Sequence, residues 1–223
     1  QRTEARHAVL FTYERSAAEI AFIARGVDHA IERLERSFGY RLLYKPHIVI
    51  YNQTRHFQAW APPQIADQFI GLVSGLWGGA VVTVHRSLEY TVYAVIQHEL
   101  THLFQFQSMR DDDVPLWWLE GTASYFEERN AQDNLGRARD FVRRFGMPDL
   151  TRTNRHLSDD DLSVTYFVGA ALIDYVIKTY GIEAFQRVHI GTARHIPFDQ
   201  ALQAAIGKTR HQLSQDFQRW LLG

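Results

Sequence analysis

A cluster of two histidines and a glutamate could bind a metal ion and use it in catalysis. His98, Glu99 and His102 form the pattern His-Glu-x-x-His within the stretch AVIQHELTHLFQF, which is typical of an amphipathic helix. Side chains four residues apart on a helix lie one turn above each other, with Cβ atoms about 5–6 Å apart, so both imidazoles can reach one ion. Glu99 then projects beside the metal rather than onto it. That position suits a general base acting on a metal-bound water.

The next apolar segment offers a third ligand. The run Asp111–Asp113 ends the first helix, Pro115 suits a first helical turn, and the apolar positions of LWWLEGTA indicate a second helix. Two helices joined by a short polar loop are expected to be antiparallel neighbours, which would bring Glu120 back to the histidines. Gly121, directly after this carboxylate, would let the two helices approach closely.

The candidate ligands fit catalytic zinc better than structural zinc. Catalytic zinc usually has three His or carboxylate ligands and an open, water-filled position, whereas structural sites normally close four protein ligands. His98, His102 and Glu120 supply three. The chain contains no cysteine, which excludes thiolate sites and disulfides. We therefore expect one Zn²⁺ per chain.

The two segments together resemble a known family. HELTH followed by PLWWLEGTASYFEE is similar to the gluzincin zinc metallopeptidases of the thermolysin-like clan. The similarity is greatest to the bacterial peptidase MA-like domain, with His-Glu-x-x-His and then a Trp-Leu-x-Glu-Gly-x-Ala-x-Tyr helix. Tyr166, Gly169, Tyr180 and Gly181 match a later family helix that begins Tyr-x-x-Gly and ends Tyr-Gly. The resemblance implies an α+β fold with a small N-terminal mixed sheet packed on helices, central active-site helices and a helical C-terminal half.

The resemblance also implies hydrolysis of peptide bonds by a zinc-activated water. Glu99 would accept the proton of this water and pass it to the leaving amine. Tyr166, carried over from the family's tyrosine, would donate its phenol O–H to the oxyanion; the alternative is an ordinary packed aromatic. Residues Gly79–Val82 contain no acid where related aminopeptidases carry Gly-x-Met-Glu-Asn, which favours an endopeptidase.

A strand before the metal-binding helix is the candidate substrate contact. AVVTVHR, residues 80–86, predicts a strand, and in the implied fold this strand often lies at a sheet edge. An open edge binds an extended peptide through backbone hydrogen bonds, whatever the peptide's side chains. We therefore expect Ala80, Val81 and Val82 to contact substrate; the alternative is an ordinary covered strand.

Several other polar residues have less specific roles. Ligating histidines usually donate their second ring N–H to a carboxylate, carbonyl or water, and the candidates are Ser124, Glu127 and Glu128. His85 and His156 have no place in the family pattern. The adjacent tryptophans 117 and 118 are expected to pack rather than to line a substrate pocket.

Two alternatives to a peptidase stay open. A protein- or peptide-binding domain could retain the fold and the zinc without turnover, and a purely structural zinc is a more remote possibility. Glu99 and Tyr166 favour the enzyme, because a binding module needs no general base. Substrate preference would depend on loops at 60–64 and 133–158, which the sequence does not place.

Composition limits the class of protein and its partners. The chain has 223 residues, 46% of them hydrophobic, which suits one catalytic domain with an α/β subdomain, 1–110, and a helical subdomain, 111–223. A net charge of −1 gives no nucleic-acid footprint. The family resemblance implies a peptide or protein substrate as the partner.

The location of the protein is less strongly indicated. Gln68–Val84 is uncharged, but glycines interrupt it and it is shorter than the roughly 20 residues of a membrane-spanning helix, so we expect a soluble domain without a transmembrane segment. The absence of cysteine and the frequent secretion or membrane anchoring of the family's members favour a secreted or extracytoplasmic bacterial protein. A first residue of Gln1 rather than Met indicates a processed form or part of a longer or membrane-anchored protein.

Periodicity predicts the elements that must position the site. A capping-box pattern at Ser16–Glu19 begins a long helix that ends at Gly39. Strands are predicted at 7–14, 47–51 and 80–86. The later helices are predicted at 137–145, 165–181, 183–189, 198–206 and 212–222.

Overall fold

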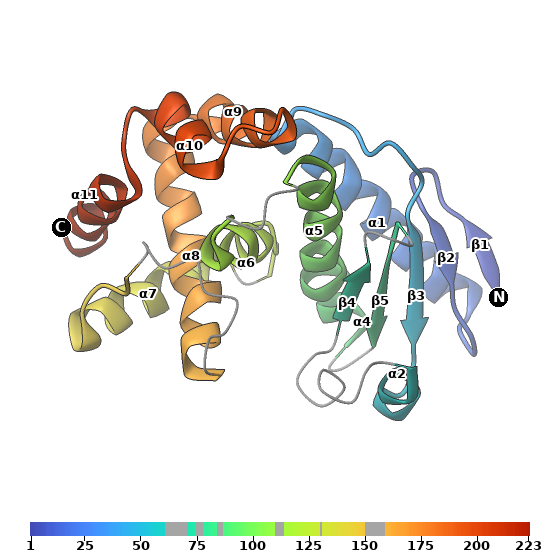
Figure 1. The fold of residues 1–223 in the computed structure, drawn as a ribbon. Helices are drawn as coiled ribbons and strands as arrows, with labels where there is room; N and C mark the ends of the chain where they lie inside the picture. The colour runs from blue at the N-terminus through green and yellow to red at the C-terminus, as the bar shows by residue number, and fades with distance from the viewer. Residues whose placement is uncertain (61–70, 75–77, 84–86, 110–113, 130, 150–158) are drawn as a thin grey trace. The chain divides into compact units, whose positions relative to one another are not determined.

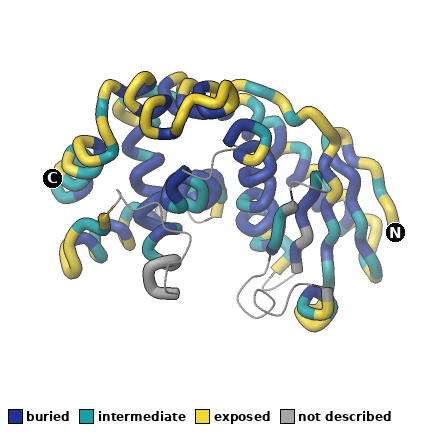
Figure 2. Tube along the Cα trace, viewed as in Figure 1, coloured by how far each residue is buried: buried dark blue, intermediate teal, exposed yellow. Residues whose placement is uncertain are grey.

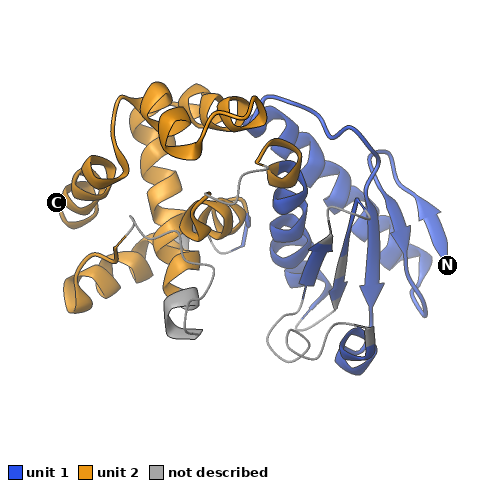
Figure 3. Cartoon of the chain, viewed as in Figure 1, with its two compact units in different colours: residues 1–104, 127–129 blue, residues 105–126, 130–223 orange. Residues whose placement is uncertain are grey.

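The computed structural model describes residues 1–60, 71–74, 78–83, 87–109, 114–129, 131–149 and 159–223 (Figure 1). These residues form an α+β chain with many helices and a five-stranded mixed sheet. The chain divides into two compact units (Figure 3). The first contains residues 1–104 and 127–129, and the second contains residues 105–126 and 130–223. The boundary thus lies within helix α5 (Gln97–Ser108) rather than after residue 110, and three later residues join the first unit.

The sheet of the first unit has the strand order β1-β2-β3-β5-β4. Its three inner strands run parallel, and an antiparallel strand lies on each outer side. Ile48, Ile50, Ala80 and Val82 are buried, as their alternating apolar pattern requires. The strands are β1 (Arg2–Glu4), β2 (Val9–Phe11), β3 (His47–Tyr51), β4 (Gly71–Ser74) and β5 (Gly79–Thr83).

The strand predictions are correct in part. The strand at 47–51 is confirmed, and the strand predicted at 7–14 is shorter, at Val9–Phe11. Of the strand predicted at 80–86, residues 84–86 lie outside the described residues, and the rest is in β5. Neither β1 nor β4 was predicted, because β1 is a short polar segment and β4 lies in a glycine-interrupted stretch without the usual alternation.

Strand β5 does not lie at the edge of the sheet. It pairs with β3 in parallel and with β4 in antiparallel orientation. The expectation that Ala80, Val81 and Val82 form an open edge is therefore wrong, and the alternative of a covered strand is correct. The physical reason is that Gly71–Ser74 forms a further strand on that side. In the described part of the chain, β4 is the outermost strand there.

The long helix α1 (Ala17–Phe38) forms as its sequence predicts. The Ser16 side chain accepts from the Glu19 backbone N–H, and the Glu19 side chain accepts from the Ser16 backbone N–H, which completes the capping box. Gly39 ends the helix at φ 77°, a left-handed conformation that glycine adopts without a Cβ penalty. A Cβ on Gly26 would lie 2.2 Å from Val92 Cγ1, so α1 packs closely against the helical stretch that leads into α5.

Helices make up the described part of the second unit, as predicted for this half of the chain. The helix predicted at 198–206 is confirmed, and the other four are longer than predicted. Helices α7, α8 and α11 begin before 137, 165 and 212, and α9 extends beyond 189. The helices are α6 (Leu116–Tyr125), α7 (Ala131–Phe145), α8 (Asp159–Tyr180), α9 (Ile182–Ala193), α10 (Phe198–Ile206) and α11 (Arg210–Leu222). The first unit also has α2 (Thr54–Trp60), which was not predicted. In the described residues, no helix is long and apolar enough to cross a membrane.

Helices α6 and α8 cross at two glycines. A Cβ on Gly121 would lie 2.4 Å from the carbonyl carbon of Gly169, and a Cβ on Gly169 would lie 2.5 Å from the Trp117 oxygen. Backbone therefore meets backbone, which only glycine permits at this distance. Gly121 was expected to bring the two metal-site helices together, but the partner that it contacts is α8. The crossing fixes α6, the helix that carries Glu120, relative to α8.

The two adjacent tryptophans at the start of α6 pack inside the second unit, as predicted. Trp118 is fully buried and stacks on Phe185, with ring centroids 5.7 Å apart. Its indole N–H donates to Nε2 of the fully buried His189, over 3.4 Å. Because Nε2 accepts, Nδ1 carries the proton and donates to Ser108 Oγ at 3.1 Å. In Figure 2, most of α6 and most of the described part of α8 have the dark blue of buried residues.

His189 should make the stability of the protein depend on pH. Burial lowers its pKa from 6.5 to about 3, so between these values the unfolded chain binds a proton that the folded chain does not. The free energy of unfolding should therefore fall as pH falls below 6.5, by up to about 1.4 kcal/mol per pH unit. Urea unfolding of metal-free wild type and His189→Gln at pH 7 and pH 5 measures this. An equal pH dependence in both proteins would contradict the prediction.

Candidate metal centre

The histidine pair lies on a continuous helical stretch from residue 88 to residue 108. It begins with α4 (Leu88–Tyr90), whose Ser87 side chain caps the Tyr90 N–H at 3.1 Å. A π-helical segment, η1 (Thr91–Ile96), then leads directly into α5. The sequence predicts a helix here but not the π segment, because the apolar pattern does not distinguish the two. Such π-helical segments are rare in proteins, and those that do occur are often found at functional sites.

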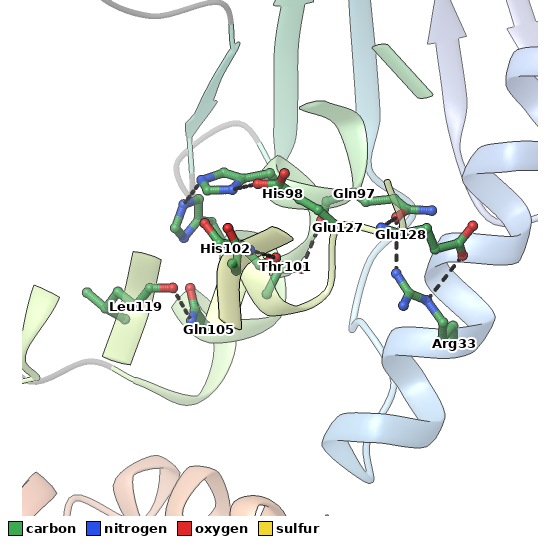
Figure 4. Close-up of polar contacts among 11 residues, drawn as sticks. Arg33, Gln97, His98, Thr101, His102, Gln105, Leu119, Glu127 and Glu128 are labelled. Atoms are coloured by element: carbon green, nitrogen blue, oxygen red, sulfur yellow. Dashed lines mark hydrogen bonds and ion pairs between the residues drawn. The ribbon is translucent and has the colours of Figure 1, made fainter. Parts of the chain in front are cut away.

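The two histidines present the same ring atom to each other. His98 Nε2 and His102 Nε2 are 3.2 Å apart, and the rings are close to perpendicular (Figure 4). Two nitrogen ligands at about 2.0–2.1 Å from a tetrahedral zinc are about 3.3–3.4 Å apart. The pair is therefore already spaced to bind one ion through both Nε2 atoms. His102 is buried and His98 is nearly so, which limits the other orientations that the two imidazole rings can adopt.

The other ring nitrogen of His98 is held by a carboxylate. His98 Nδ1 lies 2.8 Å from Glu127 Oε1, and both side chains are 13% exposed. This bond places the proton on Nδ1 and leaves Nε2 free of a proton for a metal, the usual role of such a partner. Of the three candidates, Ser124 is buried and offers its backbone carbonyl to Asn134, while Glu128 contacts other residues. The sequence could not choose among them.

Glu120 completes a group that could hold a metal ion. It is half-buried on α6, and one of its carboxylate oxygens and one ring nitrogen each of His98 and His102 all lie within 4.8 Å of one another. One imidazole pair and one carboxylate are the donor set that catalytic zinc accepts. Three residues that the sequence predicts as ligands are thus brought together, with Glu99 outside the group.

Glu99 is buried against β4, one of the two outer strands of the described sheet. Only 8% of its surface is exposed, and a Cβ on Gly71 would lie 2.5 Å from Glu99 Oε1. The backbone of β4 at Gly71 therefore lies close to the carboxylate, and a side chain at this position would have to displace the Glu99 side chain. Gly71 was not predicted as a site residue, because its only signal in the sequence is the interruption of an uncharged stretch by glycine.

Of the remaining predicted site residues, some lie among the described residues and others do not. Tyr166 is half-buried on α8, one turn before the Gly169 crossing with the helix of Glu120. Ala80 and Val82 are buried in β5, away from any described sheet edge. His85 and His156 lie outside the described residues.

Comparisons with models of known protein families and with curated proteins found no match for this chain. The candidate site is therefore defined by its own residues. His98, His102 and Glu120 form the possible metal group, and Glu127 and Glu99 flank it.

Proposed function

We propose that the protein is a zinc-dependent peptidase of the gluzincin type, and that it acts as an endopeptidase on peptide or protein substrates. One observation carries the proposal: His98, His102 and Glu120 form a three-ligand group, while Glu99 follows the first ligand without joining the group. Three ligands leave a zinc coordination position for water or substrate. The family resemblance of HELTH and LEGTASY adds the reaction class.

The chain's own residues supply the proton transfers. A zinc ion bound by the three ligands would act as a Lewis acid and lower the pKa of a bound water towards about 7. Glu99 accepts the proton of the attacking water and delivers it to the leaving amine. Burial of Glu99 against β4 orients its carboxylate and keeps bulk water from competing for it. Glu127 holds His98 in the tautomer that leaves Nε2 available for the metal.

Strand β4 is the substrate strand in this proposal, in place of β5. Its outer side has no partner strand among the described residues, and Gly71 lies against Glu99. An extended peptide paired with this edge would pass beside the general base. Every second backbone amide of such a peptide would face the strand.

Backbone methylation tests the substrate strand. In a series of peptides methylated at one backbone nitrogen each, kcat/KM should fall about fivefold or more at alternate positions, because each lost hydrogen bond costs about 1 kcal/mol or more. Alanine substitutions at the same positions serve as controls and should not show the alternation. Equal tolerance of methylation at every position would reject the role of β4.

Tyr166 is the proposed oxyanion donor. A single donor directed at the developing charge contributes about 10²–10³ in rate. Tyr166→Phe should therefore lower kcat by about 10²-fold with zinc content and KM little changed. Tyr180→Phe, at the other end of α8, is the matched control and should retain the wild-type rate. A normal kcat in Tyr166→Phe would return Tyr166 to the role of a packed aromatic.

The proposed function is tested by measuring zinc content and peptide cleavage on the same preparation. We expect about one zinc per chain, cleavage within a mixed peptide library, loss of cleavage on chelation and recovery with added zinc. Stoichiometric zinc without cleavage of any peptide or protein tested would favour a zinc-retaining binding domain. A chain that binds no zinc would contradict the proposal.

A further inference from the structure

Glu128, in the segment 127–129, is held by polar contacts that do not involve the candidate metal ligands. The backbone N–H of Glu128 donates to Gln97 Oε1 at 3.0 Å, and Arg33 Nη2 donates to the same oxygen at 3.1 Å. Arg33 Nε also lies 3.5 Å from Glu128 Oε1, and His29 Nε2 lies 3.1 Å from that atom. Figure 4 shows Arg33, Gln97 and Glu128 in this arrangement. All four residues belong to the first unit.

The orientation of the Gln97 side chain follows from these contacts. Its Oε1 receives two donors, so the opposite amide orientation would place an NH₂ group against a guanidinium and a backbone N–H. The residue is fully buried, and its Nε2 has no hydrogen-bond partner among the described residues. An apolar side chain of similar size would avoid the unsatisfied Nε2, but it would take this acceptor away from the Arg33 guanidinium and the Glu128 N–H. The amide oxygen of Gln97 is therefore the atom that joins the Arg33 side chain to the Glu128 backbone.

The contacts restrain both ends of the bond between Glu127 and His98. Gln97 immediately precedes His98, and Glu128 immediately follows Glu127. The Gln97 oxygen and the Arg33 guanidinium therefore tie the backbone of the carboxylate to the backbone of the histidine. The next residue on each segment, His98 after Gln97 and Glu127 before Glu128, forms the 2.8 Å bond between His98 Nδ1 and Glu127 Oε1. Small shifts of residues 127 and 128 would move the carboxylate away from the ring.

We propose that Arg33 and Gln97 are positioning residues for the metal ligand His98, acting through Glu128 and Glu127. The proposal rests on the zinc site of the proposed function. Arg33 suits this task because its planar guanidinium can bind two oxygens in a fixed geometry, which a lysine ammonium does not do. The metal affinity of the chain thereby depends on a residue of α1, 65 positions before the first ligand.

Zinc affinity of the metal-free protein, measured by competition with a chromophoric chelator, tests the proposal. Loss of an outer partner of a metal ligand typically weakens metal binding 10–100-fold, so Glu127→Ala and Arg33→Met should each weaken zinc binding, the second by about tenfold. The double variant should bind zinc no more weakly than Glu127→Ala alone, because both changes remove the same restraint. Arg25→Met, an exposed arginine on the same helix, is the control and should be unchanged.

Three outcomes would overturn the proposal while leaving the zinc site intact. They are wild-type zinc affinity in Arg33→Met, additive losses in the double variant, and an equal loss in Arg25→Met. Arg33→Lys decides the matter if Arg33→Met does not fold, and should weaken binding about threefold, because lysine keeps the charge but not the two-oxygen contact. Wild-type protein that binds no zinc would overturn the proposed function together with this proposal.

Discussion

Replacing Glu99 with glutamine should lower kcat for peptide hydrolysis by about 10³-fold without loss of zinc. General base catalysis contributes about 10²–10⁴ to rate, and glutamine keeps the shape of the side chain but cannot accept the proton. Glu99 lies outside the group of possible ligands, so the metal content of the variant should remain one per chain. Zinc content, kcat and KM on one peptide identified from the library measure this effect.

The control for this change is Glu183→Gln. Glu183 is exposed on α9, and its change should leave kcat at the wild-type value. Glu99→Gln that still turns over at the wild-type rate would show that another group accepts the proton. Loss of zinc in Glu99→Gln would instead make Glu99 a ligand, contrary to the arrangement described above.

Removal of one ligand should weaken zinc binding about 10²–10³-fold. Zinc-binding free energies of protein sites are of the order of 10 kcal/mol, and one of three ligands accounts for roughly a third of that value at most. His102→Gln and Glu120→Gln should therefore both lose zinc in the presence of a competing chelator. The two variants address one ligand on α5 and one on α6 separately. Chelator competition at neutral pH gives the two dissociation constants.

An exposed histidine provides the control for ligand removal. His211→Gln, on α11, removes an imidazole without touching the group and should bind zinc as wild type does. Wild-type affinity in Glu120→Gln together with weak binding in His102→Gln would show that the carboxylate is not a ligand. Wild-type affinity in both variants would place the metal elsewhere.

Much of the fold could be predicted because its signals are local. The capping box of α1, its end at Gly39, strand β3 and helix α10 follow from residues within a few positions of one another. A helix is held by hydrogen bonds between residues four apart, so its apolar period and its caps are visible in a short window. The π segment η1 was not predicted, because its apolar residues have no distinct period.

The partners of the site could be predicted only in part. Two histidines one helical turn apart must lie together whatever surrounds the helix, and this is why His98 and His102 face each other at 3.2 Å. The choice of Glu127 rather than Ser124 or Glu128 depends on how the chain turns after α6, which no periodicity encodes. The same limit applies to the contact between Gly121 and Gly169.

The sequence by itself determined the residue types and the helical spacing of a possible zinc site, because both are properties of neighbouring residues. Tertiary structure alone decided which strand is outermost, which strand covers Glu99 and which carboxylate holds His98. Strand order and side-chain contacts join residues far apart in the chain, so their energies depend on packing that local sequence does not report. For this reason β5 was wrongly expected at the edge of the sheet, while His98, His102 and Glu120 were correctly expected to lie together, as a group that could hold a metal ion.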